Sequence, residues 1–197
     1  MRRVGESMRR ALSGNGLVLY ACDLGSLKPE TLDAIKSGTV ERKETAEKLS
    51  ATELDQIIGI DSNPSLAKKR LTERFEQGAS LYLFKAEGKL AGYGWTLVGR
   101  TVEPHFFPLN ANDVHLFDFF VLPEFRGRRI NPLLVNHILK EMALEKKTRA
   151  FIEAAEWNHP QLASLARTPF RPIGTARKCC VFGRTVVVWS GEKKNCP

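Results

Sequence analysis

A strongly hydrophobic stretch covers residues 114–122, with the sequence VHLFDFFVL. Most of its positions are aliphatic or aromatic rather than alternately polar, which is the pattern of a strand buried on both faces of a sheet. Pro123 has no backbone amide for a strand ladder and ends the run. We therefore predict a central strand here, around which the rest of the chain is arranged.

A basic loop and a helix follow this strand. The loop contains three arginines and one glycine: Arg126, Gly127, Arg128 and Arg129. Asn131 followed by Pro132 is typical of a helix start, because Asn caps free amides and Pro at the first helical position leaves none unsatisfied. The helix is expected to run to about Lys147. Free amides, the helix dipole and guanidinium groups converge in such a unit, which therefore predicts an anion site with phosphate as the expected ligand.

Short strands and helices are predicted on both sides of this unit. Strands are expected at 16–23, 81–86, 90–102, 149–155 and 181–189, with a hairpin turn at 87–89. Helices are expected from about 29 to 38, 50 to 58, 63 to 78 and 160 to 167, where cap and proline signals precede apolar positions. The segment 39–48 is polar and receives no element, and 101–112 is expected to be a connecting loop.

Length and composition favour one globular domain. The chain has 197 residues, 43% of them hydrophobic, and we expect a single domain over 1–197. Residues 1–15 are expected to be a flexible basic N-terminus and 190–197 a tail. The four cysteines lack C-x-x-C spacing, so neither a disulfide framework nor a metal site is expected. No persuasive signal peptide and no run of about 20 apolar residues is present, which favours a cytoplasmic protein without membrane association.

The formal net charge of +8 is by itself compatible with nucleic acid, a membrane surface or an acidic ligand as partner. Lysines and arginines are scattered, with no RNA-binding signature of aromatic and basic residues and no continuous basic amphipathic helix. The densest structured cluster is the loop at 126–129. A polyanionic coenzyme accounts for that cluster, so neither nucleic acid nor a membrane is expected as a partner.

Two motifs resemble signatures of the GNAT superfamily of N-acetyltransferases. The segment from Val121 to Asn131 is similar to its coenzyme-binding pattern, a strand ending V-x-P, then R/Q-x-x-G-x-G/A and a helix. Arg126 keeps the first signature position, whereas the two small positions are Arg129 and Asn131 in this chain. The spacing of Asn158, Leu165 and Phe170 resembles the N-x7-Y-x4-F register of ribosomal-protein N-terminal acetyltransferases.

The resemblance implies an α/β fold of the GNAT type, with a mixed, mostly antiparallel sheet of about six to seven strands. Helices are expected on both faces of the sheet, and a central strand pair is expected to splay apart. The implied activity is transfer of an acyl group from acetyl-CoA or another acyl-CoA to an amine or hydroxyl of a small molecule or peptide, by direct attack in a ternary complex. A catalytically degenerate coenzyme-binding or regulatory domain, an acyl carrier protein as donor, and a homodimer remain open alternatives.

The resemblance also implies which residues contact the coenzyme. Main-chain groups near the end of the central strand would hold the thioester carbonyl, the loop would hold the phosphates, and Asn158 would bind the coenzyme arm. Asn158 is equally readable as a cap for the helix that follows. The candidate coenzyme-binding residues are Val121, Leu122, Arg126, Gly127, Arg128, Arg129, Ile130, Asn131 and Asn158.

Three residues are candidates for the general base that amine acylation requires. Glu153 is preferred, because it lies five residues before Asn158, where the ribosomal-protein acetyltransferases carry a catalytic glutamate. Asp118 competes as an acid within the apolar central strand, where it must face a cleft or find a partner. His115 is the third candidate.

Two further positions concern the leaving group and the acceptor. Leu165 occupies the position of the family's tyrosine acid, which leaves the proton donor unassigned. Phe106 and Phe107 in the connecting loop are candidates to line the acceptor site, with folding back onto the core as the alternative.

Overall fold

The computed structural model describes residues 16–28, 30, 32, 35, 38–102, 108–181 and 184–190. Within these ranges the backbone forms one eight-stranded sheet in the order β2-β3-β4-β5-β6-β1-β7-β8. β5 and β6 are parallel, whereas the other neighbouring strands are antiparallel. The strands are β1 (Gly16–Asp23), β2 (Thr39–Lys43), β3 (Ser80–Ala86), β4 (Lys89–Val98), β5 (Val114–Val121), β6 (Arg149–Ala155), β7 (Arg171–Val181) and β8 (Arg184–Ser190).

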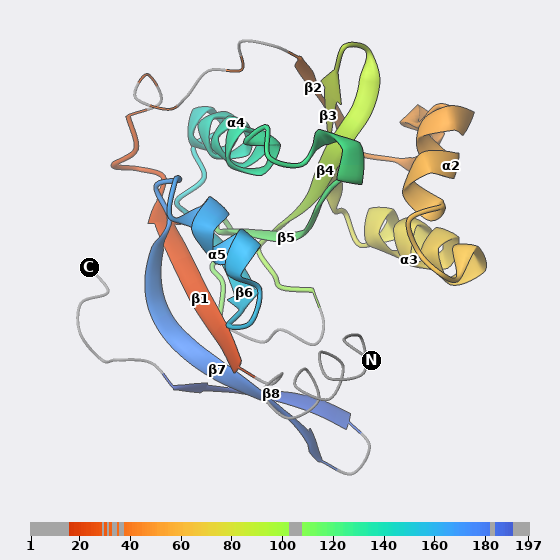
Figure 1. The fold of residues 1–197 in the computed structure, drawn as a ribbon. Coiled ribbons are helices and arrows are strands. Elements are labelled where there is room, and N and C mark those ends of the chain that lie inside the picture. Colours follow the sequence, from red (N-terminus) through yellow and green to blue (C-terminus); the bar gives the residue numbers. More distant parts are fainter. Residues whose placement is uncertain are drawn as a thin grey trace.

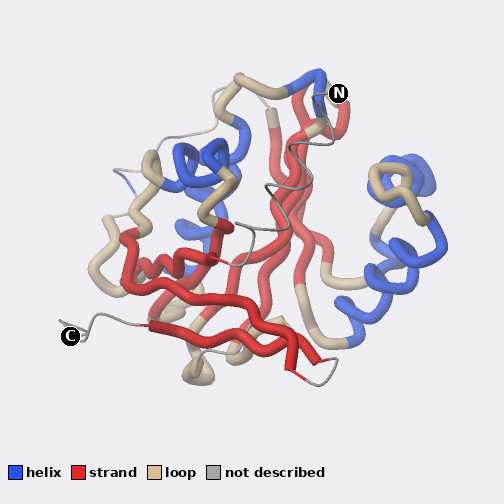
Figure 2. Tube along the Cα trace, turned by 60° about the horizontal axis from the view of Figure 1, so that its bottom comes forward, coloured by secondary structure: helices blue, strands red, loops and turns tan. Residues whose placement is uncertain are grey.

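Helices cover both faces of the sheet. They are α2 (Ala51–Ile58), α3 (Pro64–Glu76), α4 (Ile130–Leu144) and α5 (His159–Leu165), with short 3-10 turns at Ala46–Lys48 and Pro123–Phe125. α2 and α3 lie on one face, and α4 and α5 on the other (Figures 1 and 2). The expected mixed, mostly antiparallel sheet with helices on both faces is therefore confirmed, although the sheet has eight strands where about six to seven were expected. Among the described residues, no helix combines the length and the apolar character needed to cross a bilayer.

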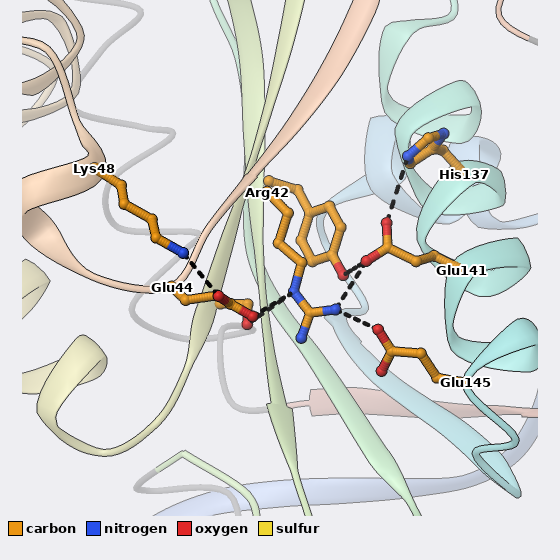
Figure 3. A network of polar contacts seen from close by, with 8 residues as sticks. Arg42, Glu44, Lys48, His137, Glu141 and Glu145 are labelled. Carbon is orange, nitrogen blue, oxygen red and sulfur yellow. Dashed lines mark hydrogen bonds and ion pairs between the residues drawn. The ribbon is translucent and has the colours of Figure 1, made fainter.

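Strand β2 has no counterpart among the sequence-based expectations, because its residues, TVERK, are mostly charged. Arg42 points towards α4, where its guanidinium donates to Glu141 and Glu145, and the Tyr82 hydroxyl donates to Glu141 at 2.9 Å (Figure 3). On the other face Lys85, from the neighbouring strand, contacts Glu41 at 2.6 Å and Glu53 of α2 at 2.8 Å. Ion pairs on both faces allow this charged segment to form an edge strand. A prediction based on hydrophobic positions misses such a strand, because it contains few of them.

Several element boundaries differ from the expectations. The expected strand at 181–189 is the second arm of a hairpin formed by β7 and β8, and β4 ends at Val98. The first strand, β1, lies between β6 and β7 and pairs with both. The expected helix at 29–38 lies mostly outside the described residues, as do the terminal segments 1–15 and 191–197.

The central strand pair splays apart beyond a β-bulge in β5. β5 pairs with β6 only from Val114 to Leu116. Phe117 faces Trp95 on β4 but Phe120 faces Tyr93, so one extra residue is inserted, and Asp118 takes a φ of 50° there. Gly94 lies opposite, where an added Cβ would sit 2.4 Å from the Phe119 ring. The bulge bends β5 away from β6, as bulges do, and the predicted splay is confirmed.

A buried ion pair joins the starts of β5 and β6. Asp113 is fully buried, and Arg149 donates to its two oxygens at 3.1 and 2.6 Å. Burial alone would raise the pKa of this carboxyl, but the bonds from Arg149, the Asn110 amide and Thr148 outweigh burial and lower the pKa below its usual value.

We expect Asp113→Asn to reduce the free energy of unfolding at pH 7, by on the order of 3 kcal/mol, since it removes the buried negative charge that Arg149 binds. A lowered folded pKa gives stability that is present above the unfolded pKa, roughly 3.9, and is lost as pH falls through the folded pKa. Urea denaturation at pH 7 and at progressively lower pH checks this. The difference between wild type and variant should shrink in acid, and a difference independent of pH would contradict the assignment.

Candidate functional site

A groove opens where β5 and β6 separate. It has a volume of about 700 Å³, and its walls come from the end of β5, the loop after it, the first turn of α4, and α5. Seven of the predicted coenzyme-binding residues line it: Val121, Arg126, Gly127, Arg129, Ile130, Asn131 and Asn158. Two do not. Leu122 is buried in the core, and Arg128 lies over the Phe125 ring with its side chain 56% exposed, 3.8 Å from Glu87.

The groove ends at the uncapped N-terminus of α4. The helix begins at Ile130, and its N-cap residue, Arg129, has a φ of 59° and makes no side-chain cap hydrogen bond. The first amides of the helix are therefore left without a side-chain acceptor, and the positive end of the helix dipole faces the groove. Arg126 donates to the Val121 carbonyl at 3.3 Å and lies over the Phe120 ring, and it lines the same groove as the start of α4. This arrangement favours an anion.

The expected role of Asn131 as helix cap is wrong. Because α4 starts two residues earlier, at Ile130 instead of Pro132, Asn131 lies inside the first turn, where its Nδ2 donates to Gln161 of α5 at 2.7 Å. Its Oδ1 is buried with no hydrogen-bond partner among the described residues. The helix also ends at Leu144, before the expected Lys147.

A second unpartnered polar atom lines the same groove. Ser164 Oγ on α5 is buried and has no hydrogen-bond partner in the described part of the chain. Buried polar atoms are nearly always hydrogen-bonded in folded proteins. Two such atoms in one groove, Ser164 Oγ and Asn131 Oδ1, therefore fit a ligand that offers both hydrogen-bond donors and acceptors along its length.

The second motif has a structural explanation in part. Asn158 caps α5, since its Oδ1 accepts from the Gln161 amide at 3.3 Å, and it lines the groove at the same time. Leu165 is fully buried in the core. Of the tyrosines, Tyr82 is bound to Glu141, and Tyr93 stacks on Phe120 with its pKa raised by burial. None of these contacts places a phenol in the groove.

Glu153 and His115 are brought together across β5 and β6. His115 Nε2 lies 2.8 Å from Glu153 Oε2, and their side chains are 0% and 8% exposed. The Val102 amide donates to His115 Nδ1 at 3.3 Å. A ring nitrogen that accepts carries no proton, so this bond places the proton of neutral His115 on Nε2, from which it is donated to the carboxylate.

Asp118 lies apart from this pair. It sits at the bulge with its side chain 45% exposed and contacts Arg74 of α3 at 2.6 Å. Arg74 in turn lies over the rings of Trp95 and Phe117. The expectation that Asp118 needs a cleft or a partner is met by Arg74. The strand is thus buried on both faces only up to Phe117.

Some site residues have no signal in the sequence. Arg167 after α5 and Ser164 within it line the groove, although no motif marks either of them. Arg74 carries no signal either, because it is one of many charged residues on a polar helix. The aromatic candidates Phe106 and Phe107 lie outside the described residues. No cluster of three or more metal-ligating side chains occurs among the residues described.

Comparisons with known proteins agree with this geometry. A family model described as the acetyltransferase (GNAT) family matches residues 49–167, more than half of the chain. No curated protein matches the sequence at a significant level.

Solved structures with a similar fold include a GNAT-family acetyltransferase from Colwellia psychrerythraea, with a TM-score of 0.58 at 14% identity, covering 90% of this chain and 56% of that one. A tandem GNAT protein from the clavulanic acid biosynthesis pathway has a TM-score of 0.57 at 16% identity, and the match covers 85% of this chain and 55% of that one. An IAA acetyltransferase from Bacillus cereus has a TM-score of 0.51 at 14% identity, and the match covers 78% of this chain and 97% of that one.

The chain spans between 55% and 65% of the length of the first structures that it matches. At these identities the similarity concerns the fold, and activity has to be argued from the site. The family match, the splayed β5–β6 pair and the uncapped start of α4 agree with one another. The chain belongs to the GNAT family of acetyltransferases.

Proposed function

We propose that the chain is an acyl-CoA-dependent N-acyltransferase that moves an acetyl or other acyl group to an amine of a small molecule or peptide. The observation that carries this proposal is the groove at the splayed strands, which ends at an uncapped helix N-terminus with Arg126 beside it. Apolar lining residues such as Phe119 and Pro160 suit a pantetheine arm, and the free amides at the start of α4 suit a pyrophosphate.

The residues of the groove suit this co-substrate chemically. Acetyl-CoA supplies an activated acyl group, whose thioester bond breaks as the new amide bond forms. The pantetheine amides and hydroxyl supply donors for Asn131 Oδ1 and partners for Ser164 Oγ, which otherwise stay unsatisfied. Ile130 and its neighbours in the first turn of α4, together with Arg126 and Arg129, would hold the phosphates.

Glu153 is the proposed general base, and His115 the residue that positions it. The attacking amine has to lose a proton as its nitrogen bonds to the acyl carbon, and Glu153 would accept that proton. The hydrogen bond from His115 Nε2 to Oε2 orients the carboxylate. His115 itself is anchored by the Val102 amide.

Asp118 is assigned a supporting role. Its carboxylate is held by the ion pair with Arg74 of α3. Its place at the bulge suits it to orient Arg74 or a bound amine.

A catalytically inactive coenzyme-binding domain is the second candidate function. The observation that favours it is the burial of Leu165, which leaves the usual acid position without a proton donor. If the chain is an enzyme, water that enters the groove would have to protonate the departing thiolate.

Release of free thiol separates the two candidates. The protein would be incubated with a panel of acyl-CoAs and a library of amines, and products would be identified by mass. We expect amine-dependent thiol release with at least one donor. Coenzyme binding without thiol release across the library would favour the inactive domain.

Arg126 and Arg128 form a matched pair for testing the phosphate end of the groove. Arg126 lines the groove, whereas Arg128 is exposed outside it. We expect Arg126→Ala to weaken CoA binding by roughly tenfold, the loss of one charge-assisted contact, and Arg128→Ala to change it by less than about threefold. Calorimetric titration of CoA measures both dissociation constants. Equal effects of the two changes would mean that general charge attraction holds the ligand and that the loop assignment is wrong.

A further inference from the structure

A second large cavity lies on the α3 face of the sheet, opposite the groove. It measures about 930 Å³ and is bounded by the C-terminal half of α3 and the chain that leaves β4. Three arginines line it: Arg70, Arg74 and Arg100. We call it the arginine cavity. α3 lies on the other face of the sheet from α4 and α5 (Figure 2), so groove and cavity approach β5 from opposite sides.

The walls of the arginine cavity contact the proposed reaction centre directly. Val102 lines the cavity, and its amide donates to His115, which holds Glu153. Arg74 lines it as well and is paired with Asp118 at the bulge. A molecule bound there is therefore linked to Asp118 through Arg74, and to Glu153 through Val102 and His115. Direct transfer requires the acceptor amine to reach the acyl carbon while the donor occupies the groove, and this cavity approaches β5 from the face that the groove leaves free.

Among the described residues that line the cavity, every charged side chain except Arg100 is paired with an opposite charge. Arg74 is paired with Asp118 at 2.6 Å, Arg70 with Asp61 at 3.4 Å, and Glu73 with Lys69 at 3.7 Å. The guanidinium of Arg100 donates to the Gln77 carbonyl, and no carboxylate of the described residues pairs with it. The five N–H donors of a guanidinium match the paired oxygens of a carboxylate or phosphate. Within the described ranges, Arg100 therefore offers a ligand a positive charge that no carboxylate neutralises.

We propose that the arginine cavity binds the acceptor and that Arg100 selects a small amine carrying an anionic group, a carboxylate or a phosphate. The inference rests on the proposed function and adds the chemical class of the substrate. It makes Arg100 a specificity-determining residue rather than a catalytic one. Arg70 and Arg74 line the same cavity, but their charges are already used by Asp61 and Asp118.

Matched acceptors test the proposal. The panel consists of ω-amino carboxylates, ω-aminoalkyl phosphates and ω-amino amides of equal, graded chain length, with acetyl-CoA as donor. We expect an anionic member to exceed its amide counterpart in kcat/KM by about tenfold or more, and the two anionic series identify which group is preferred. Arg100→Gln should abolish this difference, mainly by raising KM for the anionic acceptors, and should change kcat/KM for the amides far less. Lys68→Gln, an equal change of charge on the exposed side of α3, should preserve it.

A binding measurement keeps the outcome independent of turnover. The N-acetylated forms of the same compounds would be titrated calorimetrically into the full chain with CoA present. Tighter binding of the anionic forms, reduced about tenfold by Arg100→Gln, supports the cavity assignment even if no amine is acetylated, in which case only the proposed function fails. Turnover or binding with no preference for the anionic group, or a preference unaffected by Arg100→Gln, overturns the inference while leaving the acyltransferase proposal standing.

Discussion

Replacing Glu153 by Gln should lower kcat by about 10²–10⁴-fold, the usual contribution of a general base. Glutamine still accepts the hydrogen bond from His115 but cannot take up the proton that the amine loses. Affinity for acetyl-CoA should stay within about twofold of wild type, because Glu153 does not line the groove. Thiol release at saturating donor, followed across pH, measures both effects, and the acidic limb of the profile should disappear in the variant.

Asp118→Asn is the matched control for this experiment. It removes a carboxylate that also lies on the β5–β6 strand pair. This carboxylate is paired with Arg74 and does not contact His115. We expect it to act on acceptor affinity or on stability rather than on the pH profile. Full turnover of the Glu153→Gln variant with an unchanged profile would sink the assignment, and Asp118 or selection of already neutral amines would replace it.

Filling the groove with Ser164→Leu should weaken coenzyme binding by at least roughly a hundredfold, or about 2.8 kcal/mol. Ser164 Oγ is buried at the groove wall, so a leucine side chain at this position takes space that the ligand needs. Equilibrium dialysis against labelled acetyl-CoA measures the loss. Circular dichroism and thermal melts establish that the variant is folded.

Ser164→Ala is the companion change and separates blockage from a lost hydrogen bond. Its hydroxyl has no partner in the described part of the free protein, so its removal should leave the free energy of unfolding unchanged or slightly increased. Coenzyme affinity should fall roughly three- to tenfold, the value of one hydrogen bond. A destabilised alanine variant with normal coenzyme affinity would show that the hydroxyl serves the fold and not the ligand.

The sequence predicts best those parts of the fold that have a local signal. The apolar run of β5, the stop at Pro123 and the basic loop before α4 all appear where the pattern places them. β2 does not, because Arg42 and Glu41 are stabilised by partners far along the chain, on α4 and β3. The start of α4 also shifts, since Arg129 adopts a left-handed conformation that overrides the Asn-Pro signal.

The candidate site divides along the same line. Val121, Arg126 and Asn158 are recognisable because they belong to motifs with fixed spacing, and they line one groove. The pairing of His115 with Glu153 depends on the register of β5 against β6, which spacing along a single chain does not encode. Ser164 and Arg100 gain significance only from what they lack, a hydrogen-bond partner and a carboxylate among the described residues, and such absences emerge only after folding.

The most direct test of the central claim is a calorimetric titration of the full chain with acetyl-CoA at low ionic strength. The account predicts one site per chain with a dissociation constant in the range of roughly 1 μM to 1 mM, weakened by added salt because phosphates meet Arg126 and the first amides of α4. The same titration of the Ser164→Leu variant should give no measurable binding. Absence of binding by the wild-type chain, or equal binding by the variant with the filled groove, would contradict the claim that this groove holds an acyl-CoA.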